Sequence, residues 1–167
     1  MIYPEGDWVL GRVDTVTVSD YTLSDGDPVT VERVDRDDSE LLEGNIRDRE
    51  ADLKDAVYVG VGSADQSRAV IGTEADYDTE VVLGVRIEGL HHSEFGHVDP
   101  DGTDGIPFGT LVDRVQNAID AELTYPNISN GDTNQDAIIT NETPQVTGWT
   151  DYYRYDFDVL VSKYEER

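Results

Sequence analysis

Residues 149–163 read WTDYYRYDFDVLVSK, and this stretch decides the fold. The odd positions from 153 to 161 are all apolar: Tyr153, Tyr155, Phe157, Val159 and Val161. Charged side chains occupy positions 154, 156 and 158 between them. A period of two is typical of a β-strand with one buried face and one wet face. We therefore expect the chain to return and build its core around this closing strand.

Two earlier stretches have the same pattern. Residues 80–90, EVVLGVRIEGL, place four apolar side chains on one side, whereas Glu80, Arg86 and Glu88 fall on the other. Residues 56–62, AVYVGVG, place three valines on one side. Both stretches are predicted to be strands of the same sheet.

One amphipathic helix is predicted over residues 110–123, TLVDRVQNAIDAEL. Thr110 and Asp113 have the spacing of a capping box, with Asp in place of the usual Glu. A single apolar helical stripe needs one sheet face to cover. The pattern predicts a two-layer α+β domain with a mainly antiparallel or mixed sheet. The helix is expected on the face made by the odd-numbered strand positions, and its stripe consists of Leu111, Val112, Val115, Ile119 and Leu123.

The remaining segments give weaker patterns. Residues 8–18 and 28–34 are rich in Val and Thr, and the turn residues of 25–28, DGDP, lie between them, so we expect a β-hairpin or β-arm over 1–36. Residues 35–55 are predicted to form a helical turn followed by a loop. Polar loops are expected over 90–108 and 127–148, the second with a short strand at 137–140. No repeat or linker divides the chain, so residues 1–167 are predicted to form a single domain.

Charge is the strongest signal in the composition. The chain has 37 Asp plus Glu against 12 Lys plus Arg, a net charge of −25, and it has no cysteine. We expect a folded protein because the apolar residues fall into periodic segments. Such an acidic chain is typical of a high-salt cytoplasm, where ions screen the self-repulsion. The charge argues against direct binding to a phosphate backbone, and the lack of cysteine excludes disulfides and thiolate metal sites.

The histidines offer one possible cation site. His91, His92 and His97 lie near Glu94 and Asp99, and zinc accepts all of these donor types. Their spacing matches no established motif, so we favour solvent-exposed histidines in a loop. Residues 99–105, DPDGTDG, are interpreted as a turn.

An acidic stretch offers a second possible cation site. Residues 132–136, DTNQD, which run from Asp132 to Asp136, have the first three ligand positions of a calcium loop. However, Ala137 stands where that loop needs glycine, and Thr143 stands where it needs an acid. We favour an ordinary acidic loop and assign no metal or cofactor to the chain.

No motif for catalysis is present in the sequence. There is no nucleophile elbow and no glycine-rich phosphate fingerprint. Three tyrosines could stack on a nucleic-acid base: Tyr152, Tyr153 and Tyr155. Their place in the alternating pattern favours packing in the core or at a protein interface instead. We therefore expect no enzyme activity and name no catalytic residue.

The order of segments resembles the tail terminator, or tail completion, proteins of long-tailed viruses, the lambda-type family. The segments are AVYVGVG at 56–62, TEVVLGVRIEGL at 79–90, LVDRVQNAIDAEL at 111–123, a variable loop, and GWTDYYRYDFDVLVSKYE at 148–165. The resemblance covers residues 55–165 and rests on segment order and pattern. Together with the acidic composition, it points to a tailed virus of a haloarchaeal host. Members of the family usually begin with a helix, so the β-arm predicted over 1–36 departs from them.

The resemblance implies a structural virion protein at the head–tail junction. It would form a hexameric ring on the head-proximal end of the tail, end tail-tube polymerisation and join the tail to the head. Its partners would be further copies of the chain, the tail tube protein and the head–tail connector or neck protein. DNA would pass the lumen without specific binding, no membrane would be involved, and assembly would take place in the host cytoplasm. The family has no catalytic residues to carry over.

Two alternatives stay open. The first is another neck or tail component, such as a head–tail connector or a tube-like subunit. The second is a metal- or small-ligand-binding cytoplasmic protein of a halophile, which requires His91, His92 and His97 to converge.

Overall fold

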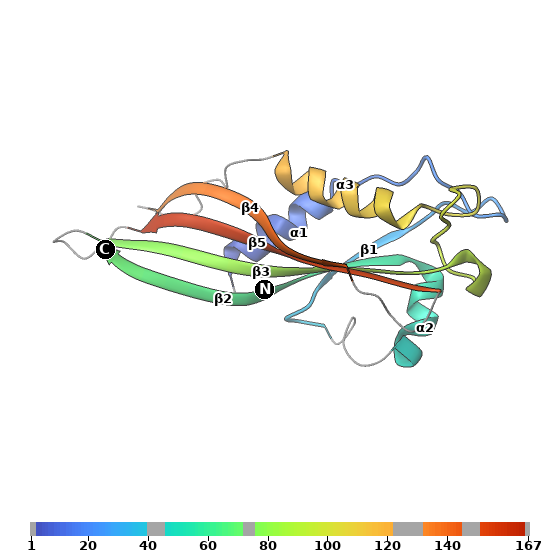
Figure 1. The fold of residues 1–167 in the computed structure, drawn as a ribbon, viewed down its shortest axis with the longest axis horizontal. Coiled ribbons are helices and arrows are strands. Elements are labelled where there is room, and N and C mark those ends of the chain that lie inside the picture. Colours follow the sequence, from blue (N-terminus) through green and yellow to red (C-terminus); the bar gives the residue numbers. More distant parts are fainter. Residues whose placement is uncertain (1–2, 40–45, 72–75, 122–131, 145–150, 166–167) are drawn as a thin grey trace.

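The computed structural model describes residues 3–39, 46–71, 76–121, 132–144 and 151–165. These residues form helices around a five-stranded sheet with the order β1-β2-β3-β5-β4 (Figure 1). β1 and β2 are parallel, and the other neighbours are antiparallel, which confirms the predicted α+β class with a mixed sheet. The elements are α1 (Pro4–Val13), β1 (Val31–Asp35), α2 (Ile46–Asp55), β2 (Val57–Ile71), β3 (Asp76–Leu90), α3 (Phe108–Asp120), β4 (Asp132–Pro144) and β5 (Tyr152–Glu165).

β3 and β5 pair along almost their whole length, from Tyr77 opposite Glu165 to Leu90 opposite Tyr152. This register places the odd positions of both strands on one face. The predicted alternation is confirmed. Tyr153 and Tyr155 on that face are partly buried. Seven other side chains on it are at most 1% exposed: Val81, Leu83, Val85, Ile87, Phe157, Val159 and Val161. β3 is the central strand, and β5 lies between β3 and the edge strand β4.

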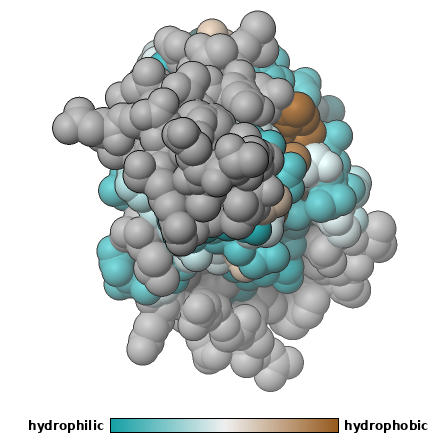
Figure 2. Space-filling view, turned by 90° about the vertical axis from the view of Figure 1, so that its left-hand side faces the viewer, coloured by the Kyte–Doolittle hydropathy of each residue, from teal (hydrophilic) through white to brown (hydrophobic). Residues whose placement is uncertain are grey.

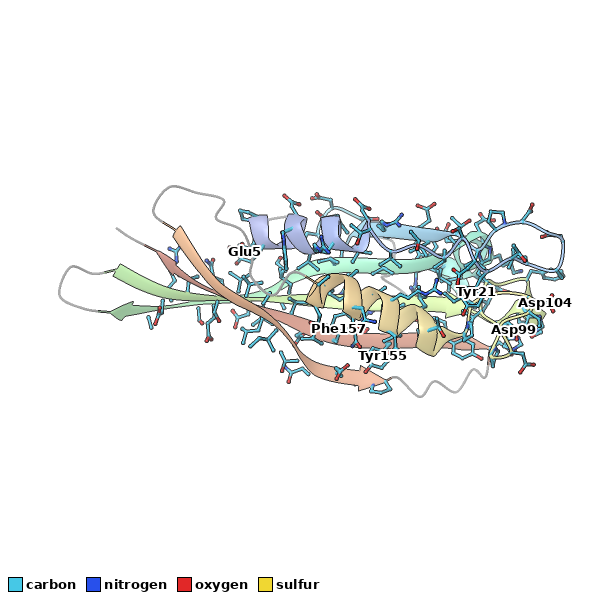
Figure 3. All side chains as sticks on the ribbon, turned by 90° about the horizontal axis from the view of Figure 1, so that it is seen from above. Glu5, Tyr21, Asp99, Asp104, Tyr155 and Phe157 are labelled. Carbon is cyan, nitrogen blue, oxygen red and sulfur yellow. The ribbon has the colours of Figure 1, made fainter. Side chains whose placement is uncertain are left out.

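α1 and α3 lie on this same face of the sheet (Figures 1 and 3). Arg12 Nε of α1 donates a hydrogen bond to the carbonyl oxygen of Ala118 in α3 at 2.9 Å, so the helices are joined directly. Their buried residues and those of the odd strand positions form one hydrophobic cluster. The core is therefore a sheet face covered by two helices rather than by the single helix that the sequence predicts.

α3 is the predicted amphipathic helix, and its buried residues are Leu111, Val112, Val115 and Ile119. It begins at Phe108, after Pro107, with no side-chain cap. The capping box predicted at Thr110 and Asp113 is wrong, because Thr110 already lies inside the first turn. Leu123 lies outside the described residues.

The strand predicted over 8–18 is wrong, because residues 4–13 form α1. The β-hairpin or arm predicted over 1–36 is reduced to a short hairpin turn, in which one antiparallel β-bridge joins Thr22 to Pro28 around the predicted turn residues 25–28. β1 is the only part of that prediction that forms a strand among the described residues, and it pairs in parallel with β2. The chain therefore has a helix before the first strand of its sheet.

Local signals explain why this segment is helical despite its valines. Pro4 stands in the first turn, where its missing N–H removes no hydrogen bond. Glu5 and Asp7 in the same turn interact favourably with the positive end of the helix dipole. Val9 and Val13 are four residues apart and both fully buried, which is the spacing of a helix face.

α2 covers one end of the opposite sheet face, where the sequence predicts a helical turn and a loop. Its sequence, IRDREADLKD, is mostly charged, so its short apolar side gives little periodic signal. The segment nevertheless builds a second, smaller cluster of Val34, Leu53, Ala56, Tyr58, Leu90 and Tyr152. Glu88, which the alternation places in water, is 0% exposed and pairs with Arg49 of α2. Burial raises the pKa of Glu88, although Arg49 opposes this shift.

β4 is a 13-residue edge strand, whereas the sequence predicts a polar loop with a strand at 137–140 only. An edge strand pairs on one side, so it can be polar over most of its length. The loop predicted over 127–148 is therefore wrong for residues 132–144, and its other residues lie outside the described part. An extended strand does not wrap its oxygen atoms around an ion, so the calcium-loop interpretation of 132–136 is also wrong.

The sheet is elongated (Figure 1). One end carries the β2–β3 hairpin, and we call it the hairpin end; the other carries the segments around 20–30 and 91–107, and we call it the loop end. Figure 2, seen from the hairpin end, shows a mostly hydrophilic described surface with one small hydrophobic area. No helix in the described ranges has the length and apolar character needed to cross a membrane.

Replacing Phe157 with Asp is expected to prevent folding. The side chain at position 157 is 1% exposed, so the new carboxylate would be buried without a partner. Circular dichroism in molar KCl measures the result. The control is Ile138→Asp on β4, where the side chain is 49% exposed and the protein should stay folded. A folded, soluble F157D protein would contradict the assignment of the buried face.

Candidate functional site

The loop end contains the candidate site. Residues 91–107 connect β3 to α3 and include a short 3-10 helix, η1 (His92–Glu94). Isolated β-bridges pair Val98 with both His91 and Ile106, so the segment is held by backbone hydrogen bonds. The predicted polar loop is confirmed, and it has a defined internal structure.

Asp99 organises the second half of this loop. Its Oδ1 accepts a hydrogen bond from Asp101 N at 3.0 Å. Its Oδ2 accepts from Thr103 N, Thr103 Oγ1 and Asp104 N at 3.1, 3.0 and 2.9 Å. Burial alone would raise the pKa of Asp99, but the hydrogen bonds outweigh it and lower the pKa to about 2. The predicted turn at 99–105 is therefore built around one ionised, 2% exposed carboxylate.

Two glycines allow the loop to close this tightly. A Cβ at Gly105, where φ is 152°, would lie 2.4 Å from the carbonyl oxygen of His97. A Cβ at Gly96 would lie 2.0 Å from the carbonyl oxygen of Leu90. Any larger residue at either position would push the two halves of the loop apart.

The three histidines do not converge. His97 is buried, its Nδ1 accepts a hydrogen bond from Thr30 N at 3.1 Å, and burial lowers its pKa. The Nδ1 of His91 accepts from Ser93 N at 3.1 Å, inside η1. The combination of His91, His92 and His97 with Glu94 as ligands of one metal is therefore wrong.

The structure instead brings His92 close to two aspartates. His92 Nε2 lies 3.7 Å from Asp99 Oδ1, and His92 Nδ1 lies 3.8 Å from Asp104 Oδ2. One ligand atom from each of the three residues lies within 4.8 Å of the others. Two ligands about 2.1 Å from one zinc ion are at most about 4.2 Å apart, so these side chains would have to move closer to bind it. His92, Asp99 and Asp104 are the described residues that could hold a divalent cation.

A cavity of about 430 Å³ opens beside this group. Its walls come from the 23–30 segment, the end of α2 and the 91–107 loop, and Figure 3 shows Asp99 and Asp104 at this loop end. Phe95 stands at its rim, 78% exposed, with Lys54 Nζ 5.9 Å from the ring centre. The cavity is large enough for a small ligand, but carboxylates dominate its polar lining, which favours a cation. The charged and histidine side chains of the lining are Asp25, Asp27, Lys54, Asp55, His92, His97 and Asp104.

The tyrosines of β5 are packed rather than displayed. Tyr152 is buried in the second cluster. The ring of Tyr153 lies 5.3 Å from that of Phe108, and the ring of Tyr155 lies 6.3 Å from that of Phe157. The structure therefore confirms packing against the body of the protein, which the sequence favours over base stacking.

Asp104 is the site residue that the metal analysis of the sequence missed. It is twelve residues from His92 in the chain, and only the turn around Asp99 brings the two together. The signal that could have found it is the run of Asp and Gly in 99–105, which requires the chain to reverse there.

The chain has no recognised relative in two comparisons with known proteins. No protein-family model matches the sequence, and no curated protein matches it significantly.

The variant Asp99→Asn is expected to lower the free energy of unfolding by about 1–3 kcal/mol, because its amide cannot replace all four hydrogen-bond acceptances. The folded-state pKa of Asp99 is about 2, below the usual 3.8. The stabilisation is therefore complete above about pH 4 and is lost as the pH falls through 2. Denaturation of both proteins between pH 7 and pH 2 measures the difference. The matched control is Asp101→Asn, an exposed residue of the same turn; an equal effect of both variants would contradict the role of Asp99.

Proposed function

We propose that this chain is a ring-forming structural protein of a tailed virus, a tail terminator at the head–tail junction. In this role six copies close a ring on the head-proximal end of the tail tube. The ring ends tube polymerisation and offers its other side to the head connector. The host is a haloarchaeon, and the protein acts by shape and assembly rather than by catalysis.

The observation that carries this proposal is the order of the elements. A strand that begins with alternating valines (β2), an alternating strand (β3), an amphipathic helix (α3) and a closing aromatic strand (β5) follow one another in the order of the resemblance, although β2 runs on to Ile71 and is as long as β3 rather than short. The predicted departure at the amino terminus disappears, because α1 precedes the sheet where the family has a helix.

The edges of the sheet also support assembly. In the described part of the chain, β4 has a strand neighbour on one side only. β1 pairs with residues 57–61 of β2, and the Asp37 carboxylate accepts a hydrogen bond from Ser63 N, so beyond Ser63 no described strand pairs with β2 on that side. These open edges lie on opposite sides of the sheet, and different surfaces that meet head to tail generate rings or filaments.

The charge of the chain agrees with a DNA passage. A net charge of −25 offers no electrostatic attraction to a polyanion, so DNA moving through a ring of such subunits would not adhere to it. The same observations fit another neck or tail component less specifically, because a connector or a tube-like subunit also assembles in rings.

The test is the mass of the assembled protein in molar KCl, alone and mixed with the tail tube protein encoded by the same virus. We expect a closed species of six copies and, in the mixture, tubes that carry the protein at one end and stop growing. Sedimentation and electron microscopy measure both results. Tubes that grow to the same length with and without the protein, and no closed oligomer, would contradict the proposal.

Cation binding is a second candidate function, and the grouping of His92, Asp99 and Asp104 favours it. If it holds, Mn²⁺ or Zn²⁺ raises the thermal midpoint of the wild-type protein and has no effect on a His92→Ala variant. His91→Ala is the matched control, because the ring of His91 is engaged with Ser93 instead. An equal response of the two variants, or no response of the wild type, would contradict a site at His92.

A further inference from the structure

We draw no further inference here: the strongest candidate, the cavity of about 430 Å³ at the loop end with the exposed Phe95 at its rim, belongs to the cation site already described, and nothing else among the described residues shows which ligand would fill it.

Discussion

The pairing of β3 with β5 is the constraint on which the rest of the structure depends. Both strands alternate over the same length, and their register aligns the two apolar sides. A slip of one residue would turn Phe157 into water and bring Asp156 and Asp158 into the core, so one register is strongly preferred. α1 and α3 can share a single cover only because this register makes a continuous apolar face.

The elements that can be predicted from the sequence are those in which apolar residues recur at a regular spacing. β3, β5 and α3 each bury one side against the same core, so their patterns are visible without knowledge of their partners. β4 could not be predicted in length, because it forms by backbone pairing with β5 and needs few apolar side chains. α1 could not be predicted because the β-propensity of its valines competes with the helix signals of its first turn.

The candidate site was less predictable than the fold, because it depends on how one loop turns. His91, His92 and His97 are close in sequence, yet the hydrogen bonds of Ser93 and Thr30 direct two of the rings elsewhere. Asp104 reaches His92 through a turn that the Asp99 carboxylate assembles. Glu88 shows the same limit in the sheet. The alternation correctly places its side chain on the face opposite the core, but α2 and Arg49 bury it there. Proximity along the chain does not specify which side chains meet.

Salt decides how such an acidic chain can associate. The Debye length is about 10 Å at 0.1 M salt and about 3 Å at 1 M, so molar salt removes most of the repulsion between exposed charges on separate copies. Ion pairs in direct contact and partly buried are screened much less, and the guanidiniums around Asp156 lie at 2.7–3.2 Å from it. Apolar burial also strengthens with excluded salts. In the high-salt medium that the composition indicates, short ion pairs and apolar burial therefore stabilise this chain more than diffuse surface charge does.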